Sequence, residues 1–283
     1  LSAQTSPVAA DAFMIAVPTP FFDDLSPDLT YVEAAVKSIA PVLAKGNLVV
    51  LESTSPVGTT EKICQWIREA RPDLTVPTDS SQPDIHVAYC PERVLPGRVV
   101  YELIANDRIV GGLTPACSEK AKALYQTFVT GECLVSDART AEMSKLTENA
   151  FRDVNIAFAN ELSLICDELN INVWELIKMA NRHPRVNILT PGAGVGGHCI
   201  AVDPCFIVHS APEQAKLIRT AREVNDFKPQ WVLQKVLSTV ANHALHKPSI
   251  ACFGLAFKPD IDDLRESPAL HIVNKLAAAY NGK

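Results

Sequence analysis

The first third of the chain alternates short apolar runs with helix-like stretches, and this rhythm restricts its fold more than any other feature. Buried parallel strands form continuous apolar runs because helices cover both faces of such a sheet. The apolar runs are residues 12–17, 47–51, 85–89 and 108–110, and the helix-like stretches are residues 30–39, 60–70 and 115–130. Strands and helices that alternate at this spacing predict an α/β fold with a doubly wound parallel sheet.

Three loops of this region are expected to carry function. Sheets of this kind bind ligands at the carboxyl ends of their strands. The loops at residues 17–20, 52–58 and 90–97 directly follow predicted strands. We therefore expect binding or catalytic groups there, and we expect Thr30 to be the N-cap of the first helix.

The remainder of the chain is predicted to be mainly helical. Residues 138–170 contain neither proline nor glycine, which predicts one unusually long helix with an apolar side. Further helices are predicted at residues 173–181 and 213–245, the second one broken near Pro229. An apolar run at residues 250–253, followed by a helix after residue 268, indicates the opening of a second sheet.

These patterns predict three domains joined by the long helix. Residues 1–137 form a Rossmann-like domain, residues 138–246 a helical domain, and residues 247–283 the start of a second Rossmann-like domain. Both sheets are expected to be incomplete within these residues.

Composition excludes several classes of protein. The chain has 26 Lys and Arg residues against 32 Asp and Glu residues, an acidic balance that argues against nucleic acid as the main partner. No apolar run is long enough to span a bilayer, and residues 1–11 lack the features of a signal peptide. The eight cysteines include no C-x-x-C pair, which is typical of reduced thiols and not of a zinc site. We expect a soluble cytoplasmic protein without a metal.

One absence leaves two possibilities open. No G-x-G-x-x-G sequence follows an early strand. Either the protein uses no dinucleotide, or the opening unit of the sheet lies outside these residues.

A glycine cluster precedes Cys199. Glycines occupy positions 192, 194, 196 and 197. Glycine allows the backbone to approach a ligand closely and to adopt positive φ. A thiol beside such a loop is a candidate nucleophile, with Asp203 four residues beyond it. The alternative is a flexible loop with an inert cysteine.

The predicted long helix carries a polar stripe. Lys145, Asn149 and Arg152 stand at i, i+4 and i+7, hence on one face. A movable charge and a neutral amide donor could together stabilise an oxyanion. A solvated helix face is the alternative interpretation.

Other polar residues are candidates with weaker signals. Arginine binds phosphate through paired hydrogen bonds, and loop Thr or Glu residues can position water or accept a proton. The candidates are Thr54, Glu92, Arg93, Arg182, His183, Arg185, Lys258 and Arg265. Each of them also fits an ordinary surface turn or helix cap.

Several motifs in order resemble the UDP-glucose/GDP-mannose dehydrogenase family. The matching segments are residues 17–20, 53–58, 90–97, 145–149, 194–199 and 257–268. The sequence around Glu92 is similar to the members that act on UDP-N-acetyl-D-mannosamine. Members acting on UDP-glucose or GDP-mannose carry a different version there.

The resemblance implies an NAD-dependent oxidation of the sugar C6 alcohol to a carboxylate in two hydride transfers, for surface polysaccharide synthesis. Cys199 would be the nucleophile that forms a thiohemiacetal and then a thioester. Lys145 would act as acid/base and oxyanion partner, and Asn149 would donate to the same oxygen. Thr54 and Asp203 would orient water, and Glu92 is the matching carboxylate, without a fixed role.

The resemblance also implies binding residues and a partner. Residues 1–137 would bind NAD and residues 247–283 UDP. Thr19 and Thr54 would contact NAD, and Arg265 its pyrophosphate side. The residues that would hold the UDP-sugar are Arg93, Val94, Lys145, Asn149, Arg152, His183, Arg185, Gly196, Phe257 and Lys258. An arginine matching Arg185 reaches across a dimer interface in relatives, which implies a homodimer.

The chain departs from the family pattern in three ways. Pro96 stands where members acting on UDP-glucose carry a second Glu, so a mechanism with two carboxylates is not expected. The opening Rossmann strand and the rest of the UDP-binding domain are missing, and residues 21–27 and 243–248 are short. We expect these residues to be part of a longer protein, whose purified mass would exceed 30.7 kDa.

Three alternatives remain at this stage. The same chemistry could act on UDP-glucose, UDP-N-acetylglucosamine or GDP-mannose. The chain could bind a nucleotide sugar without catalysis. A thiol hydrolase that pairs Cys199 with His198 or His183 ranks last, because no arrangement in the sequence requires such a pair.

Overall fold

A computed structural model describes residues 2–22, 24, 26–94, 97–197, 199–243, 249–258 and 261–280. The chain divides into two compact units, Leu1–Thr147 and Glu148–Lys283.

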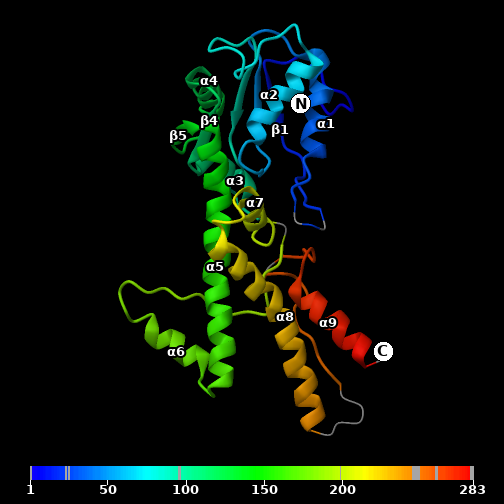
Figure 1. Ribbon diagram of the computed structural model, residues 1–283, viewed down its shortest axis with the longest axis vertical. Coiled ribbons are helices and arrows are strands. Elements are labelled where there is room, and N and C mark those ends of the chain that lie inside the picture. The colour runs from blue at the N-terminus through cyan, green and yellow to red at the C-terminus, as the bar shows by residue number, and fades with distance from the viewer. Residues whose placement is uncertain are drawn as a thin grey trace. The chain divides into compact units, whose positions relative to one another are not determined.

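A five-stranded sheet forms the centre of the first unit (Figure 1). Its strands are β1 (Ala12–Ile15), β2 (Leu48–Leu51), β3 (His86–Tyr89), β4 (Arg108–Gly112) and β5 (Cys133–Asp137), which lie side by side in chain order. β1, β2 and β3 are parallel, and so are β4 and β5, but β4 runs antiparallel to β3. The α/β prediction is confirmed, with a mixed sheet in place of a purely parallel one.

The reversal at β4 follows from the segment between β3 and β4. A parallel crossover needs a helix that packs along a face of the sheet. The link holds only α3 (Val99–Ala105), a short helix on which Val99, Val100 and Tyr101 are exposed. Without a packed crossover, the chain returns in the opposite direction.

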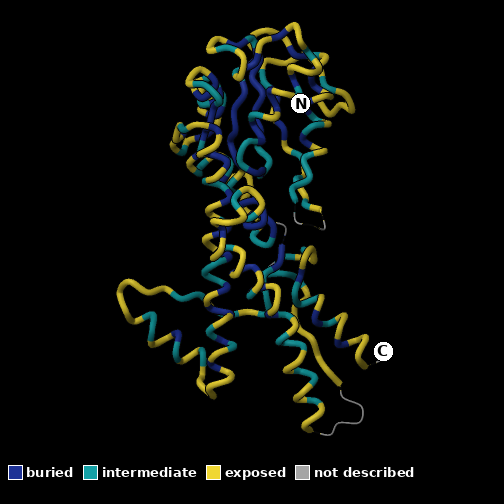
Figure 2. The backbone as a smooth tube through the Cα atoms, in the orientation of Figure 1, coloured by how far each residue is buried: buried dark blue, intermediate teal, exposed yellow. Residues whose placement is uncertain are grey.

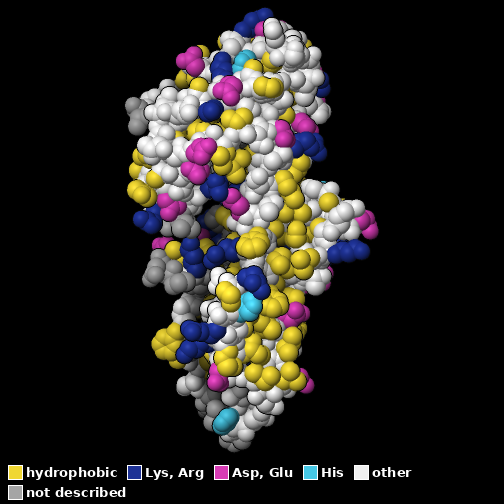
Figure 3. All heavy atoms as spheres, turned by 90° about the vertical axis from the view of Figure 1, so that its left-hand side faces the viewer, with side chains coloured by type: hydrophobic (Ala, Val, Ile, Leu, Met, Phe, Trp, Pro, Cys, Tyr) yellow, Lys and Arg dark blue, Asp and Glu magenta, His cyan; other side chains and the backbone are white. Residues whose placement is uncertain are grey.

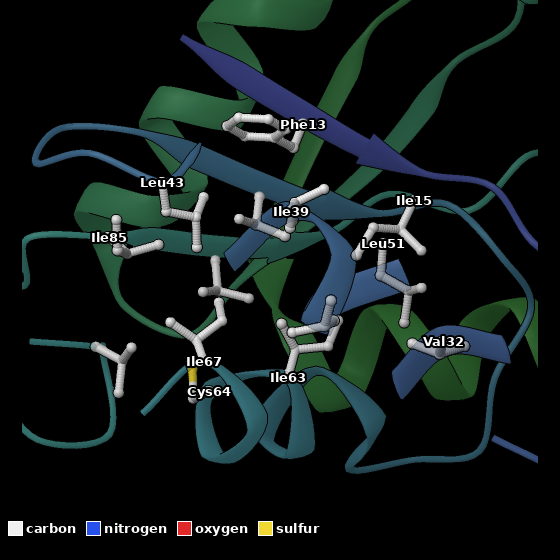
Figure 4. Close-up of a cluster of buried hydrophobic side chains, with 14 of the residues drawn as sticks. Phe13, Ile15, Val32, Ile39, Leu43, Leu51, Ile63, Cys64, Ile67 and Ile85 are labelled. Carbon is white, nitrogen blue, oxygen red and sulfur yellow. The ribbon is translucent and has the colours of Figure 1, made fainter. Parts of the chain in front are cut away.

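Alternate residues of β2 point to opposite faces and build two separate cores. Val49 and Leu51 pack with α1 (Thr30–Ile39) and α2 (Thr59–Ala70) (Figure 4). Leu48 and Val50 pack on the other face with residues of α4 (Pro115–Tyr125). Right-handed crossovers place helices on one face while the strands run one way, and on the other face once the direction reverses. Helices therefore cover both faces, as the sequence predicts.

The helix starts include one correction. The N-cap of α1 is Leu29, and the carboxylate of Asp28 accepts hydrogen bonds from Thr30 N at 2.9 Å and Thr30 Oγ1 at 2.6 Å. Thr30 is therefore the first residue of the helix and not its N-cap, and Asp28 supplies an acceptor for the first backbone N–H of α1. A 3₁₀ turn, η1 (Ala40–Val42), follows α1.

The long helix is confirmed as α5 (Ala138–Glu168), 31 residues that pass from the first unit into the second. The other helices described in the second unit are α6 (Val173–Ala180), α7 (Asp203–Ser210), α8 (Lys216–Asn242) and α9 (Pro268–Ala279). In the part of the chain that is described, none of the helices combines the length and the apolar character needed to span a membrane.

The break expected at Pro229 is absent, since α8 continues through it. Proline removes one main-chain hydrogen bond from a helix interior. Arg222, Asn225 and Lys228, on the turns before it, are buried, and their contacts hold the helix together across that defect.

The strand predicted at residues 250–253 does not form. Residues 251–255 are exposed, with Phe253 at 93% (Figure 2). An isolated strand is not stable without neighbours that satisfy its backbone groups. The second unit contains no strand among its described residues, so nothing there pairs with the apolar run.

Candidate functional site

The first two loops of the sheet edge are joined by hydroxyl groups. Val17 N donates to Ser53 Oγ at 2.8 Å, and Ser53 Oγ donates to the carbonyl of Val17 at 2.7 Å. Thr19 Oγ1 donates to the carbonyl of Thr54 at 2.5 Å. Thr19 and Thr54, predicted separately from the sequence, therefore lie together beyond the carboxyl ends of β1 and β2, where sheets of this kind bind ligands.

A buried carboxylate fixes the end of the second loop. Glu142, on α5, accepts hydrogen bonds from Gly58 N at 2.6 Å, Thr60 N at 2.8 Å and Thr60 Oγ1 at 2.6 Å. Burial raises the pKa of Glu142, and these hydrogen bonds act in the opposite direction. The first turn of α2 thereby receives an acceptor for its unpaired donors. Sequence reasoning missed Glu142 because its partners are distant in the chain.

The third loop holds Glu92, Arg93 and Val94. Glu92 Oε1 accepts a hydrogen bond from Val94 N, and Arg93 Nη1 donates to the carbonyl of Asp107 at 3.2 Å. Glu92 is exposed, whereas Arg93 and Val94 are half-buried. Pro96, which separates the chain from relatives with a second Glu, lies outside the described residues.

A buried cluster joins the bases of the second and third loops. Tyr125 Oη donates to Glu52 Oε1 at 2.6 Å. Burial raises the pKa of the neighbouring Cys90 thiol to about 12. A thiol with such a pKa is inert at neutral pH, so Cys90 is a core residue and not a nucleophile.

Two predicted catalytic residues of the second unit are in direct contact. The side-chain amide of Asn149, on α5, donates to Asp203 Oδ2. Asp203 is the buried first residue of α7, where a carboxylate is favoured by the helix dipole. Asp203 N and Val202 N donate to the carbonyl of Cys199 at 2.9 Å and 3.1 Å. Cys199 therefore stands in the turn that leads into α7, and its side chain is exposed.

The glycines before Cys199 allow another segment of the same chain to approach the loop closely. A Cβ at Gly196 would lie 2.4 Å from the carbonyl oxygen of Glu266, and one at Gly197 would lie 2.8 Å from the ring of Phe257. Gly197 also has a φ of +83°. Only glycine fits there, because any side chain would collide with the segment around residues 257–268.

The same loop is anchored at its other end. Gly192 N donates to Asn160 Oδ1 at 2.8 Å, and Asn160 Nδ2 donates to Asn225 Oδ1 at 2.9 Å. Asn225 Nδ2 donates to Asp153 Oδ1 at 2.8 Å, and Arg222 Nη1 donates to the same oxygen at 2.6 Å. All of these side chains are buried. α5 thus fixes the loop before Cys199 through Asn160 and after it through Asn149.

The charge of Asp153 is compensated inside this network. Burial raises the pKa of Asp153, and the guanidinium of Arg222 is the largest influence that lowers it. Sequence analysis did not single out Asp153, Arg222 or Asn225. These residues are polar and lie within predicted helices, which was the one available sign of a role. Their spacing in the sequence does not reveal that they are buried.

Arg265 lies close to the same loop. Gly197 N donates to the carbonyl of Arg265 at 3.3 Å. The Arg265 guanidinium is paired with Asp263, which is the main cause of its raised pKa, and the charge of Cys199 contributes in the same direction. A guanidinium that is paired with Asp263 therefore stands near the exposed thiol of Cys199.

The remaining predicted binding residues are partly or fully exposed. The ammonium of Lys258 lies 5.8 Å from the centroid of the Phe257 ring, and both residues are half-buried. His183 and Arg185 are exposed in a loop closed by Asn181, whose side chain bonds both backbone groups of Ile188 at 2.7 Å and 2.9 Å. That loop is thus well defined, and its basic side chains are available to a ligand.

The polar stripe of α5 is only partly engaged. Lys145 is half-buried in the first unit, while Arg152 is exposed in the second. Of the three residues of the stripe, Asn149 is the one with a contact to another predicted site residue.

Three segments of the chain match domains of one family. Residues 1–129 match the NAD-binding domain of the UDP-glucose/GDP-mannose dehydrogenase family, residues 139–227 its central domain, and residues 251–281 its UDP-binding domain.

Individual relatives agree. The UDP-N-acetyl-D-mannosamine dehydrogenase of Escherichia coli (strain K12) is 64% identical, over 100% of this chain and 69% of the relative. The NDP-N-acetyl-D-galactosaminuronic acid dehydrogenase of Ralstonia solanacearum is 67% identical, over 100% of this chain and 66% of the relative. A solved UDP-N-acetyl-mannosamine dehydrogenase from S. aureus has a TM-score of 0.88 and 49% identity, over 99% of this chain and 66% of that one.

These relatives are longer than the chain, which spans about two thirds of their length. The resemblance expected from the motifs is confirmed, including an NAD-binding domain and the dehydrogenase class. The chain belongs to the UDP-glucose/GDP-mannose dehydrogenase family.

Proposed function

We propose that the whole protein oxidises the C6 alcohol of UDP-N-acetyl-D-mannosamine to the carboxylate, giving UDP-N-acetyl-D-mannosaminuronate for surface polysaccharide synthesis in the cytoplasm. One observation carries the proposal. Cys199 is exposed in a loop that α5 anchors on both sides, through Asn160 and Gly192 before it and through Asn149 and Asp203 after it. A nucleophile needs both this access and this fixed position.

The chemistry assigns a step to each residue. NAD, when bound, accepts the hydride in each of the two oxidations. Lys145 takes the proton of the C6 hydroxyl in the first oxidation, which yields an aldehyde. The Cys199 thiol adds to the aldehyde carbon and its proton ends on the oxygen, forming a thiohemiacetal. In the second oxidation the hydride leaves to a second NAD molecule and the hydroxyl proton to solvent, which leaves a thioester, and water hydrolyses it to the carboxylate and the free thiol.

The neighbouring groups support these steps by their chemistry. The positive charge of Lys145 and an amide hydrogen of Asn149 would stabilise negative charge on the substrate oxygen. Asp203 and Thr54 would orient the water that hydrolyses the thioester. Glu92 is exposed at the end of the β3 loop, and we assign it to the site without a defined step.

The proposed binding residues divide by ligand. Thr19 and Thr54, joined beyond β1 and β2, suit a dinucleotide at the sheet edge, and Arg265 suits its pyrophosphate. The proposed UDP-sugar contacts are Arg93, Val94, Arg152, His183, Arg185, Gly196, Phe257 and Lys258. We likewise propose the division into an NAD-binding domain (1–137), a central domain (138–246) and the start of a UDP-binding domain (247–283).

A homodimer is part of the proposal. The apolar side expected for the long helix is partly exposed to solvent. Phe158 and Ile165 of α5 are exposed, as are Leu169 just after it and Trp174 on α6. Hydrophobic side chains gather on the helical part of the face drawn in Figure 3. An apolar surface of this kind is typical of a subunit interface. Arg185 would then reach the site of the neighbouring subunit.

A second substrate has a specific observation in its favour. The relative named for N-acetyl-D-galactosaminuronic acid is 67% identical, against 64% for the mannosamine enzyme. The two sugars differ only in the orientation of ring substituents. Identity at this level does not separate them, so the galactosamine sugar is the competing candidate.

The test is an assay of NADH release by the full-length protein. We expect UDP-N-acetyl-D-mannosamine to give the highest kcat/KM and two NADH molecules per sugar. The comparison substrates are UDP-N-acetyl-D-galactosamine, UDP-N-acetylglucosamine, UDP-glucose and GDP-mannose. Preference for another donor would overturn the assigned sugar, and saturable binding without NADH would overturn catalysis.

Lys145→Ala tests the proposed role of Lys145 as acid/base and oxyanion partner. An oxyanion partner acts mainly in the transition state, so kcat should fall roughly 100-fold or more while KM changes little. Lys62→Ala, on the exposed side of α2, is the matched control and should leave both values unchanged. A rise in KM alone would reduce Lys145 to a binding contact.

A further inference from the structure

The second unit contains a pocket that the proposed chemistry does not use. Its volume is about 500 Å³, and it is formed by the last turns of α5, the start of α6, the beginning of the glycine loop and α8. The lining side chains that matter here are Ser163, Asp167, Trp174, Lys228 and Trp231.

Lys228 is a buried cation within this pocket. Its residue is 3% exposed, its ammonium donates to Ser163 Oγ, and the nitrogen lies 4.1 Å from the centroid of the Trp231 ring. Among the described residues, no carboxylate stands within ion-pair distance of it. Burial lowers the pKa of Lys228 to about 8, so the group is still mainly charged at neutral pH. A buried charge without a counter-charge is costly, which makes an anion a favourable neighbour.

One carboxylate, Asp167, lines the pocket together with Lys228. Asp167 is the carboxylate that acts on Lys228 over a distance, but it forms an ion pair with Lys235. The Lys235 ammonium lies 5.5 Å from the Trp231 ring, on the same part of α8. Asp167 is thus engaged by Lys235, whereas the Lys228 ammonium has no carboxylate of its own within ion-pair distance in the described part of the chain.

We propose that this pocket binds an organic anion, a ligand whose carboxylate or phosphate group accepts a hydrogen bond from Lys228. Charge-assisted hydrogen bonds of this type are stronger than those between neutral groups. Ile171 and Val232 line the pocket as well and provide an apolar surface for the body of the ligand. The site is independent of the proposed reaction.

Its position also links the pocket to the loop that carries Cys199. Gly192 and Ala193 line it, and the same Gly192 is held by Asn160. A bound anion would contact the segment whose anchoring fixes the loop. The expected consequence is a more rigid loop when the pocket is filled.

The test uses the fluorescence of the full-length protein. The probes are inorganic phosphate and acetate, titrated at constant ionic strength. Trp231 is the reporter because it lies against the ammonium that the anion would contact. We expect a saturable change in fluorescence, at least tenfold weaker binding in Lys228→Gln, and binding within twofold of the original in Lys178→Gln, an exposed lysine of α6.

Two further variants serve as controls. Lys228→Met replaces Lys228→Gln if the latter is shown to be unfolded by circular dichroism. Trp231→Phe should lose the signal while calorimetry still detects binding. Tighter binding of phosphate assigns a phosphate ligand, and tighter binding of acetate assigns a carboxylate. No saturable change with either anion, or equal affinity in Lys228→Gln, would overturn the site.

Discussion

Glu142 and Asp153 lie about three turns apart on α5, one in each unit, and both are fully buried. Their surroundings differ. Glu142 accepts hydrogen bonds from neutral groups at the start of α2, whereas Asp153 is paired with the guanidinium of Arg222. A helix start offers several free N–H donors and a favourable dipole, so a carboxylate can be buried there without a cation. Asp153 contacts helix interiors, where such donors are already used, and it needs an opposite charge.

The two carboxylates also hold different loops in place. Glu142 fixes the end of the loop with Thr54, and the Asp153 network fixes the loop before Cys199. The first anchor is a single cap, while the second is a chain of four side chains. We therefore expect the second to be the more sensitive to substitution.

Asp153→Ala should have the largest effect on stability. It removes the buried partner of Arg222, whose remaining ion pair is with the exposed Asp226, and breaking a buried pair typically costs about 3–5 kcal/mol in the free energy of unfolding. Urea unfolding followed by circular dichroism measures this. The double variant Asp153→Ala/Arg222→Ala should recover part of the loss, and a double variant less stable than Asp153→Ala would contradict the assigned pairing.

Glu142→Ala should cost less, about 1–3 kcal/mol, because it leaves neutral donors unsatisfied and no charge unpaired. The same unfolding measurement applies. Glu69→Ala, which removes an exposed carboxylate on α2, is the matched control. A larger loss for Glu142→Ala than for Asp153→Ala would reverse the ranking of the two anchors.

Asn160→Ala separates anchoring from overall stability. It should cost about 1–2 kcal/mol and lower kcat by freeing Gly192, while KM for the UDP-sugar stays near its original value. Asn155→Ala removes a local bond to Phe151 on the same helix and should spare kcat. Equal effects of the two variants on kcat would remove the anchoring role of Asn160.

The pH dependence of stability should be the smallest signal. Burial raises the pKa of Glu142 above its ordinary value of 4.5, so the folded state holds this proton more tightly than the unfolded state does. The carboxyl group therefore disfavours folding increasingly as the pH rises from about 4.5 to the raised pKa. Glu142→Gln lacks this titration, so its stability relative to the original protein should rise over that window in urea unfolding. A relative fall would contradict the raised pKa.

Local sequence patterns predicted much of the fold. Apolar runs located β1, β2, β3 and β4, because buried strands need such residues, and the absence of glycine and proline located α5. β5 was missed because Leu134 and Val135 are exposed and the strand is only partly apolar. The direction of β4 and the absence of a strand at residues 250–253 depend on contacts with neighbouring segments. The periodicity of the sequence does not give these contacts.

The candidate site residues that belong to sequence motifs could be named from the sequence. Thr19 with Thr54, and Asn149 with Asp203, were named from the sequence and are in contact. Glu142 and Asp153 were not named, because burial at a position distant in sequence is what gives each its role. The glycine cluster was interpreted as room for a ligand, and the close neighbour in the described chain is the segment of Phe257.

The most direct test of the central claim is the product formed by Cys199→Ser. The full-length variant is incubated with NAD and UDP-N-acetyl-D-mannosamine, and the sugar products are separated by mass spectrometry in the presence of an aldehyde-trapping amine. We predict that UDP-sugar binding is retained and that trapped aldehyde accumulates in place of the carboxylate. Undiminished formation of the carboxylate would show that the second oxidation proceeds without a covalent bond to this sulfur.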